Sequence, residues 1–184
     1  MKGGGGKQRR RAAALAIALL LSLPAGLAVV ARRRLDSPER FVRALGGEYL
    51  GRAGVVLQQA ENDCGAAAMK MIFDHHGIER PLATWNAALI DHPRGSSMLR
   101  MRDLARACGL EAEGWRVAER DLPAVPLPAI ALVDSHHYVV LERIEADAVI
   151  YADPALGRVR MNRSLFLRKS GGRMLLFRTP ERSP

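Results

Sequence analysis

A helical pattern begins within the stretch Gln58-Gln59-Ala60-Glu61-Asn62-Asp63-Cys64-Gly65. From Asp63 to His76 small and apolar residues recur at helical spacing, and Gly77 is placed to end the helix. Asp63 is a typical N-cap residue, which puts Cys64 in the first turn. Unpaired backbone amides and the positive end of the helix dipole favour a thiolate there. Cys64 is therefore a candidate nucleophile, although a lone cysteine is more often buried and inert.

Gln58 is a candidate partner of this nucleophile, because it precedes Cys64 by six residues. A loop of that length can bring the side-chain amide alongside the sulfur. The amide N–H and the backbone N–H of Cys64 would then hold the oxyanion of a tetrahedral intermediate. Gln59 offers the same chemistry, and the residues alone do not choose between the two glutamines.

Short stretches rich in Val, Ile and Tyr predict strands at residues 129–133, 136–144 and 148–152. The last two are expected to form a hairpin around residues 145–147. With a turn of three or five residues, His137 and Asp153 share one face, directly opposite or one diagonal step apart, about 5 to 8 Å from each other. An imidazole and a carboxylate would then lie within hydrogen-bonding reach.

The adjacent histidines His136 and His137 point to opposite faces of the second predicted strand. His137 shares its face with Val139 and Leu141, which is the more apolar face and the one expected to meet the cysteine helix. We therefore favour His137 as a general base. A core histidine and a turn aspartate remain the simpler interpretation of this pair when it is taken alone.

An oxyanion donor, a nucleophile, a base and an orienting carboxylate are the parts of a cysteine hydrolase. Competing sites are poorly supported. The doublets His75-His76 and His136-His137 diverge, so they lack a chelating spacing, and no metal or cofactor is expected. Ser96-Ser97 is interpreted as a loop and N-cap before a helix from Met98, and no phosphate-binding glycine loop is present. We expect Cys108 to pack in that helix rather than pair with Cys64.

Residues 1–34 form a separate, basic-flanked segment. They hold eight of the 28 basic residues and none of the 19 acidic ones, so the rest of the chain is near neutral and a nucleic-acid groove is not supported. Ala12 to Ala31 carries no charge and fits either a signal peptide or a membrane anchor. The stronger basic cluster before it favours an exported C-terminal part, periplasmic or anchored in a bacterial membrane. We expect a connector at residues 35–50 and one domain at 51–184.

From about Val55 to Phe177 the sequence resembles the bacteriocin-processing, or double-glycine, cysteine endopeptidases. The matching motifs are Gln58 before Asp63-Cys64-Gly65, the run His137-Tyr138-Val139-Val140, and Asp153-Pro154 sixteen residues after the histidine. The resemblance implies a papain-like α+β fold, with helices packed on an antiparallel sheet. It also implies Cys64 as nucleophile, His137 as base and acid, Asp153 as its orienting carboxylate, and Gln58 in the oxyanion hole.

Members of that family typically cut a leader peptide after a Gly-Gly-like pair, and their domain usually precedes an exporter ATPase. This chain has no such ATPase, so we expect any exporter to be a separate partner. The expected function is a thiol endopeptidase that cleaves an exported peptide or protein precursor through a thioester acyl-enzyme. Two alternatives remain: a papain-like amidase or transpeptidase, and a membrane-tethered module that docks peptides without cutting them.

Overall fold

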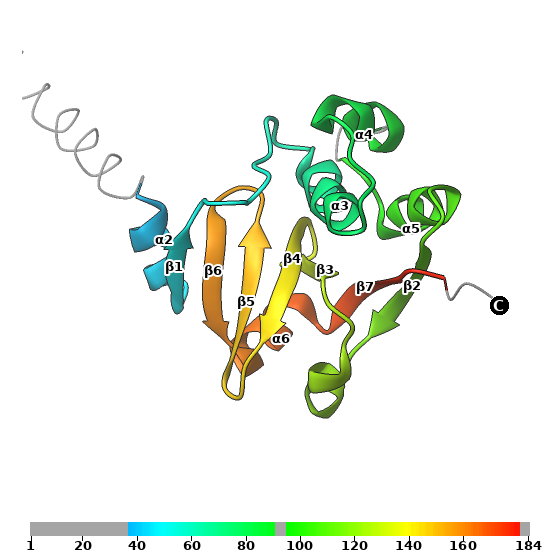
Figure 1. Ribbon diagram of the computed structural model, residues 1–184. Coiled ribbons are helices and arrows are strands. Elements are labelled where there is room, and N and C mark those ends of the chain that lie inside the picture. The colour runs from blue at the N-terminus through cyan, green and yellow to red at the C-terminus, as the bar shows by residue number, and fades with distance from the viewer. Residues whose placement is uncertain (1–36, 91–94, 181–184) are drawn as a thin grey trace, which may run out of the picture. The chain divides into compact units, whose positions relative to one another are not determined.

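A computed structural model describes residues 37–90 and 95–180. The chain divides into two compact units between Phe41 and Val42, and the second unit carries the whole sheet (Figure 1). Its seven antiparallel strands lie in the order β1-β6-β5-β4-β3-β7-β2. The strands are β1 (Gly47–Gly51), β2 (Glu111–Arg116), β3 (Ala129–Val133), β4 (His137–Ile144), β5 (Ala148–Asp153), β6 (Gly157–Asn162) and β7 (Arg173–Arg178). The helices are α2 (Pro38–Ala44), α3 (Cys64–His75), α4 (Leu82–Leu89), α5 (Met98–Ala107), α6 (Arg163–Ser170) and the 3-10 helix η1 (Glu119–Ala124).

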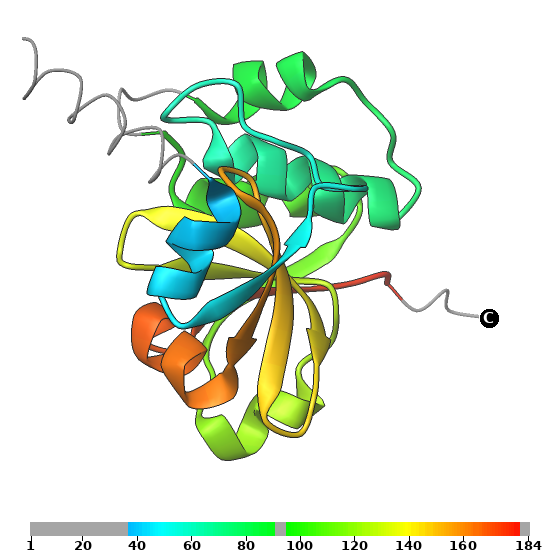
Figure 2. The ribbon, with the colours of Figure 1, turned by 90° about the vertical axis from the view of Figure 1, so that its left-hand side faces the viewer.

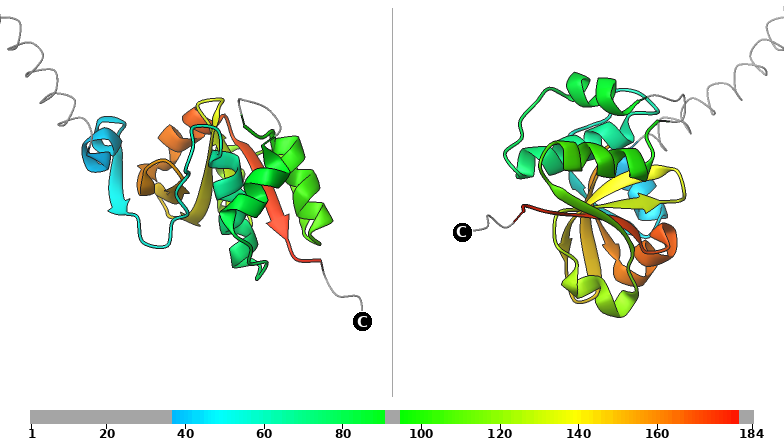
Figure 3. Two further views of the ribbon diagram at one scale, coloured as in Figure 1. Left: turned by 90° about the horizontal axis from the view of Figure 1, so that it is seen from above. Right: turned by 90° about the vertical axis from the view of Figure 1, so that its right-hand side faces the viewer.

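Helices cover both faces of this sheet, which confirms the predicted α+β class. Helices α3, α4 and α5 pack on one face, and α6 and η1 lie on the other (Figures 2 and 3). The first core is centred on Phe73 of α3 and the second on Phe166 of α6, and both side chains are fully buried. Strand β5 is buried along its whole length because it lies between two strands and two layers of helices.

The predicted hairpin is present, but its turn length differs from the prediction. The innermost pair, Ile144 and Val149, encloses four residues, which alone would put His137 and Asp153 on opposite faces. A bulge between Leu141 and Arg143 adds one residue to β4, and this extra residue returns His137 to the face that carries Asp153. Asp153 consequently lies one diagonal step from His137, on the same face. The bulge carries no clear sequence signal.

The reason given above for choosing His137 over His136 is wrong. Helix α3 packs against Tyr138 and Val140 of β4, whereas Val139 and Leu141 belong to the core under α6. Both faces of β4 are buried, so an apolar face does not identify the side that meets the cysteine helix. His137 is the first residue of β4, so its position at the strand end, rather than the face of the strand, decides what it reaches.

The sheet also begins earlier than the predicted domain boundary at residue 51. Strand β1 pairs with β6 and therefore belongs to the sheet, although most of it falls in the predicted connector 35–50. Within residues 37–90 and 95–180 no helix is both long and apolar enough to cross a membrane. The predicted signal peptide or anchor in residues 1–34 lies outside the described residues.

Gly172 gives a stability prediction, because it follows α6 where the chain passes close to Val117. Its φ is +68°, and a Cβ there would lie 2.2 Å from the Val117 carbonyl oxygen. The Gly172→Ala variant should therefore lose about 2 to 3 kcal/mol of unfolding free energy, measured by urea denaturation. Gly114→Ala is the matched control, because a Cβ at Gly114 meets nothing within 4 Å. Equal urea midpoints for both variants would contradict the prediction.

Candidate active site

Cys64 begins helix α3 and is buried, with 7% of its surface exposed. The helix ends as the sequence predicted: Gly77 has a φ of +74°, and the backbone N–H of Ile78 donates to Phe73 O at 2.8 Å. Asp63 occupies the N-cap position, as predicted, but its side chain makes no capping hydrogen bond. The amides of the first turn remain available to the sulfur.

His137 and Asp153 meet at the ends of neighbouring strands. The Nε2–H of His137 donates to Asp153 Oδ1 at 2.8 Å, and the backbone N–H of Ala155 donates to the same oxygen at 2.8 Å. Asp153 is buried and His137 is half-buried. Because Nε2 is engaged by Asp153, Nδ1 is the ring nitrogen left for the hydrogen bond that His137 makes to Cys64.

The turn before His137 is held in an unusual conformation. Asp134 and Ser135 have φ values of 50° and 67°, in the left-handed region that residues other than glycine rarely adopt. Lys169 Nζ lies 2.8 Å from Asp134 Oδ2, and Arg173 Nη2 donates to Ser135 Oγ at 3.0 Å. These contacts from α6 and β7 fix the loop that delivers His137 to the strand end.

Cys64 and His137 shift each other's protonation. Burial raises the pKa of Cys64, but hydrogen bonds from His137 and from the backbone of Tyr138 and Gly65, together with the charge of His137, bring the pKa below its ordinary value. Burial lowers the pKa of His137, yet the hydrogen bonds and charges of Asp153 and Cys64 raise it to about 10. Both shifts therefore favour the pair of a thiolate and an imidazolium over the neutral thiol and imidazole.

This pair predicts the pH dependence of alkylation. The thiolate is the reactive form, so in a Cys108→Ala background iodoacetamide should label Cys64 below the pH range of an ordinary thiol. The His137→Ala variant retains burial but loses the contacts that lower the pKa, so its labelling profile should move to higher pH. Mass spectrometry of the labelled peptide across pH 5 to 10 checks both curves. Coincident curves would show that His137 does not act on the thiol.

Gln58 lies on a loop that is hydrogen-bonded to the turn directly after Asp153. Its backbone N–H donates to Pro154 O at 2.9 Å, and its Nε2 donates one hydrogen to Ala60 O at 2.9 Å. The second Nε2 hydrogen remains for another acceptor, and the buried Oε1 has no partner among the described residues. Gln59 is exposed. The loop geometry therefore favours Gln58 over Gln59 as the amide that faces the site.

The model of the peptidase C39 family matches residues 52–182. The chain belongs to the peptidase C39 family. C39 is a family of cysteine peptidases, and the predicted family resemblance is confirmed.

Named relatives of this C39 peptidase are longer proteins. It is 32% identical over 127 residues to the probable functional amyloid protease FapD of Pseudomonas fluorescens, covering 62% of this chain and 56% of that protein. It is 30% identical over 133 residues to the lactococcin-G-processing and transport ATP-binding protein LagD of Lactococcus lactis, covering 69% of this chain and 19% of that protein. The match thus spans about half of the one relative and a fifth of the other.

Solved structures place the fold. A double glycine motif protease from an AMS/PCAT transporter, crystallised with a leader peptide, matches with a TM-score of 0.66 and 29% identity over 73% of this chain and 98% of that one. The peptidase domain of Streptococcus ComA matches with a TM-score of 0.62 and 20% identity, over 68% of this chain and 97% of that domain. The second likeness supports the fold alone.

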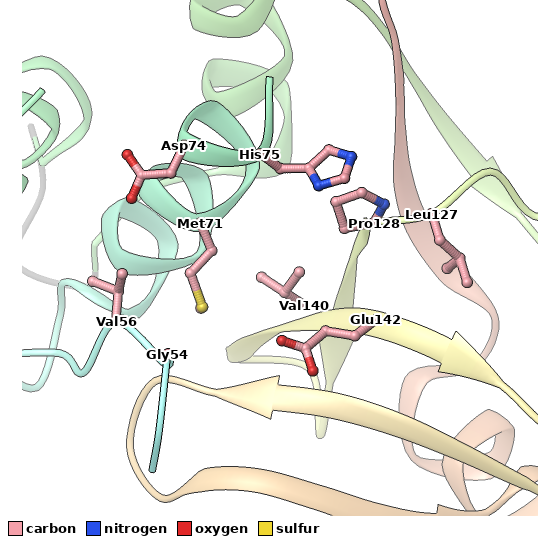
Figure 4. Close-up of a pocket in the computed structure, with 9 residues that line it drawn as sticks. All are labelled: Gly54, Val56, Met71, Asp74, His75, Leu127, Pro128, Val140 and Glu142. Carbon is pink, nitrogen blue, oxygen red and sulfur yellow. The ribbon is translucent and has the colours of Figure 1, made fainter. Parts of the chain in front are cut away.

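A groove of about 430 Å³ lies between α3 and β4 of this C39 peptidase. Figure 4 shows the Met71 side chain of α3 extending toward Val140 and Glu142 of β4. The segment that leads to Gln58 contributes Gly54 and Val56 to the wall, and the entry to β3 contributes Leu127 and Pro128. Asp74 and His75 of α3 also line the groove. Its lining is mostly apolar and includes the carboxylates of Asp74 and Glu142.

The tertiary structure shows two contacts around the site that the sequence did not predict. Asn86 of α4 places its amide Nδ2 3.5 Å from Asp63 Oδ2. Gly95 packs on the loop before Cys64, because a Cβ there would lie 2.4 Å from Asn62 O. Neither residue carries a catalytic motif, so only long-range packing reveals them. Ser97 accepts a hydrogen bond from the backbone N–H of Arg100 and caps α5, as predicted.

Cys64 and Cys108 are both free thiols. Cys108 is half-buried at the C-terminal end of α5, where burial raises its pKa. In the part of the chain that the structure describes, no cluster of three or more His, Cys, Asp or Glu side chains could hold a metal ion.

Proposed function

We propose that this C39 peptidase cleaves an exported peptide or protein precursor after a Gly-Gly-like pair, through a thioester at Cys64. The observation that carries the proposal is the position of His137, which contacts Cys64 and donates to Asp153 at 2.8 Å. In this proposal Cys64 is the nucleophile, His137 the general base and acid, and Asp153 its orienting carboxylate. Gln58 and the backbone N–H of Cys64 form the oxyanion hole.

The chemistry takes two steps. The Cys64 thiolate attacks the scissile carbonyl carbon, and the oxyanion is held by the Gln58 amide. The imidazolium of His137 then gives its proton to the leaving amine as the C–N bond breaks, leaving a thioester. In the second step His137 takes a proton from water, the hydroxide attacks the thioester, and the thiolate is released. Asp153 keeps the imidazole ring oriented throughout.

The substrate class is supported by the relatives and by the groove. One relative is named a functional amyloid protease and another a lactococcin-processing protein, and the solved protease with a TM-score of 0.66 holds a leader peptide. The groove beside α3 offers apolar wall residues such as Val56, Met71 and Val140, which suit apolar side chains of a peptide. Two small residues at the cleavage site let the scissile carbonyl approach a nucleophile that neighbouring groups enclose.

The partner and the location are further parts of the proposal. A separate exporter would deliver the precursor, in keeping with relatives named as transport or secretion ATP-binding proteins. The uncharged residues 12–31, flanked by basic clusters, would act as a signal peptide or as a membrane anchor that leaves the peptidase outside the cytoplasm.

The proposed function is tested by incubating the purified chain with leader peptides that end in Gly-Gly and with variants carrying Val at each glycine. We expect cleavage after the second glycine, suppression by Val, and loss of cleavage once Cys64 is alkylated. Stalled acyl-enzyme should appear by mass spectrometry as the N-terminal fragment in thioester linkage to Cys64. Transfer of that fragment to an added amine instead of water would favour a transpeptidase. Tight peptide binding without cleavage would favour a docking module.

A further inference from the structure

Asp63 is a buried carboxylate that faces away from the helix it precedes. It is 1% exposed and makes no side-chain capping bond to α3. Instead its Oδ2 accepts the backbone N–H of Gln59 at 3.0 Å, and its Oδ1 accepts the backbone N–H of Ala60 at 3.1 Å. The two oxygens therefore hold two successive peptide groups of the loop before the nucleophile.

Because of this orientation, the backbone amides at the start of α3 remain available to the sulfur of Cys64. A carboxylate that capped the helix would bring its negative charge onto the first-turn amides and oppose a thiolate there. Here the Gly65 backbone N–H acts on Cys64 and contributes to its lowered pKa. An acidic residue directly before the nucleophile is thus accommodated, because its carboxylate accepts hydrogen bonds from the earlier residues Gln59 and Ala60.

The Asp63 contacts lead directly to Gln58. Ala60 donates its N–H to Asp63 and accepts the Gln58 Nε2–H on its carbonyl oxygen at 2.9 Å. Gln58 is also anchored through its backbone N–H to Pro154 O, directly after Asp153. The amide of Gln58 therefore takes its position from two supports, the Asp63 carboxylate through Ala60 and the turn that carries Asp153.

Two outer contacts fix Asp63 and its loop. Asn86 places Nδ2 3.5 Å from Asp63 Oδ2, and Gly95 lies against Asn62 O, where a Cβ would approach to 2.4 Å. Helix α4 and the start of the segment leading to α5 therefore press on the loop from outside. The Asp63 carboxylate has little freedom to leave the two loop amides.

From these contacts we propose that Asp63 is a positioning residue of the oxyanion hole, which acts on the reaction through Gln58. The proposal rests on the peptidase function proposed above. Asp63 touches neither the substrate nor the sulfur in this role. It holds the Gln58-Gln59-Ala60 loop so that one Gln58 hydrogen stays on Ala60 O and the other faces the scissile carbonyl.

A double-mutant cycle in the full chain tests this role. Asp63→Asn has nearly the same shape, but its amide nitrogen cannot accept one of the two loop N–H groups. We expect kcat to fall about 10- to 100-fold and KM to change less than about 3-fold, because loss of a whole oxyanion donor costs roughly 100- to 1,000-fold. In a Gln58→Ala background, the same substitution should cost less than about 3-fold. Asp103→Asn, on the exposed surface of α5, is the matched control.

Two results would count against this role of Asp63. An equal loss of kcat from Asp63→Asn in both backgrounds would overturn the proposal, because a general structural role does not depend on Gln58. Unchanged kcat would overturn it as well. If Asp63→Asn does not fold, Asn86→Ala replaces it in the cycle and should show a smaller loss with the same dependence on Gln58. Iodoacetamide labelling should be unchanged, since the thiolate contacts come from His137, Tyr138 and Gly65.

A peptide aldehyde ending in Gly-glycinal gives a readout that does not require turnover. The Cys64 thiolate adds to its carbonyl carbon, and the resulting alkoxide occupies the oxyanion position. Asp63→Asn should weaken this binding about 10-fold when Gln58 is present and much less when Gln58 is alanine. If the wild-type chain binds the aldehyde with this dependence yet cleaves no peptide, the proposed function fails while the role of Asp63 stands. Equal aldehyde affinity in wild type and Asp63→Asn would overturn the Asp63 proposal.

Discussion

Replacement of Cys64 by alanine is expected to abolish peptide cleavage, with a loss of at least about 10,000-fold in kcat. The reaction needs a nucleophile that forms a thioester, and the methyl group of alanine can form no such bond. Cys64 is buried at the start of α3, so the small alanine side chain fits without a clash. Cleavage rates should be measured by chromatography of the peptide products under reducing conditions.

Cys108→Ala is the matched control for this variant, because it removes the other thiol of the described chain. Cys108 ends α5, where burial raises its pKa. We expect kcat within about 2-fold of wild type, since an exposed or half-buried substitution away from the site has small effects. Cleavage that survives Cys64→Ala and disappears with Cys108→Ala would reverse the assignment of the nucleophile.

A measurement of precursor binding distinguishes the effect of Cys64→Ala on catalysis from its effect on peptide docking. The Cys64→Ala variant should bind a leader peptide with an affinity close to that of wild type, because the groove is formed by other residues. Isothermal titration of the uncleaved peptide into this variant checks the expectation. Loss of both binding and cleavage would mean that the substitution disturbs the fold rather than the chemistry.

Replacement of His137 by alanine is expected to lower kcat about 1,000- to 10,000-fold at pH 7. The variant loses the imidazolium that stabilises the thiolate and the proton donor for the leaving amine. Asp153 then remains buried without its partner at 2.8 Å, although the Ala155 amide still donates to it. Part of the loss should be recovered at higher pH, where more of the thiol ionises without help.

His136→Ala is the matched control for His137. His136 is exposed, and its Nδ1 lies 2.6 Å from Asp134 O, away from the hydrogen bond between His137 and Asp153. We expect its kcat to stay within about 3-fold of wild type. A comparable loss in both variants would show that the turn, rather than the imidazole of His137, is what the reaction requires.

Local sequence patterns were enough to predict the class of fold and the residues of the candidate site. Val- and Ile-rich stretches predicted β3, β4 and β5, and small residues at helical spacing after Asp63 predicted α3, because both patterns follow from local periodicity. The spacing of Gln58, Cys64, His137 and Asp153 indicated the cysteine peptidase family, which the match over residues 52–182 confirms. The roles of these four residues remain predictions until the variants above are measured.

Long-range packing sets how these residues meet. The bulge in β4 puts His137 and Asp153 on one face, and neither residue type nor strand periodicity encodes it. Asp63 looked like a helix cap, yet burial under α4 and the nearby amides of Gln59 and Ala60 turn its carboxylate to the loop. The sequence shows which hydrogen-bonding groups each residue carries. Packing between segments far apart in the chain selects the partners that those groups find.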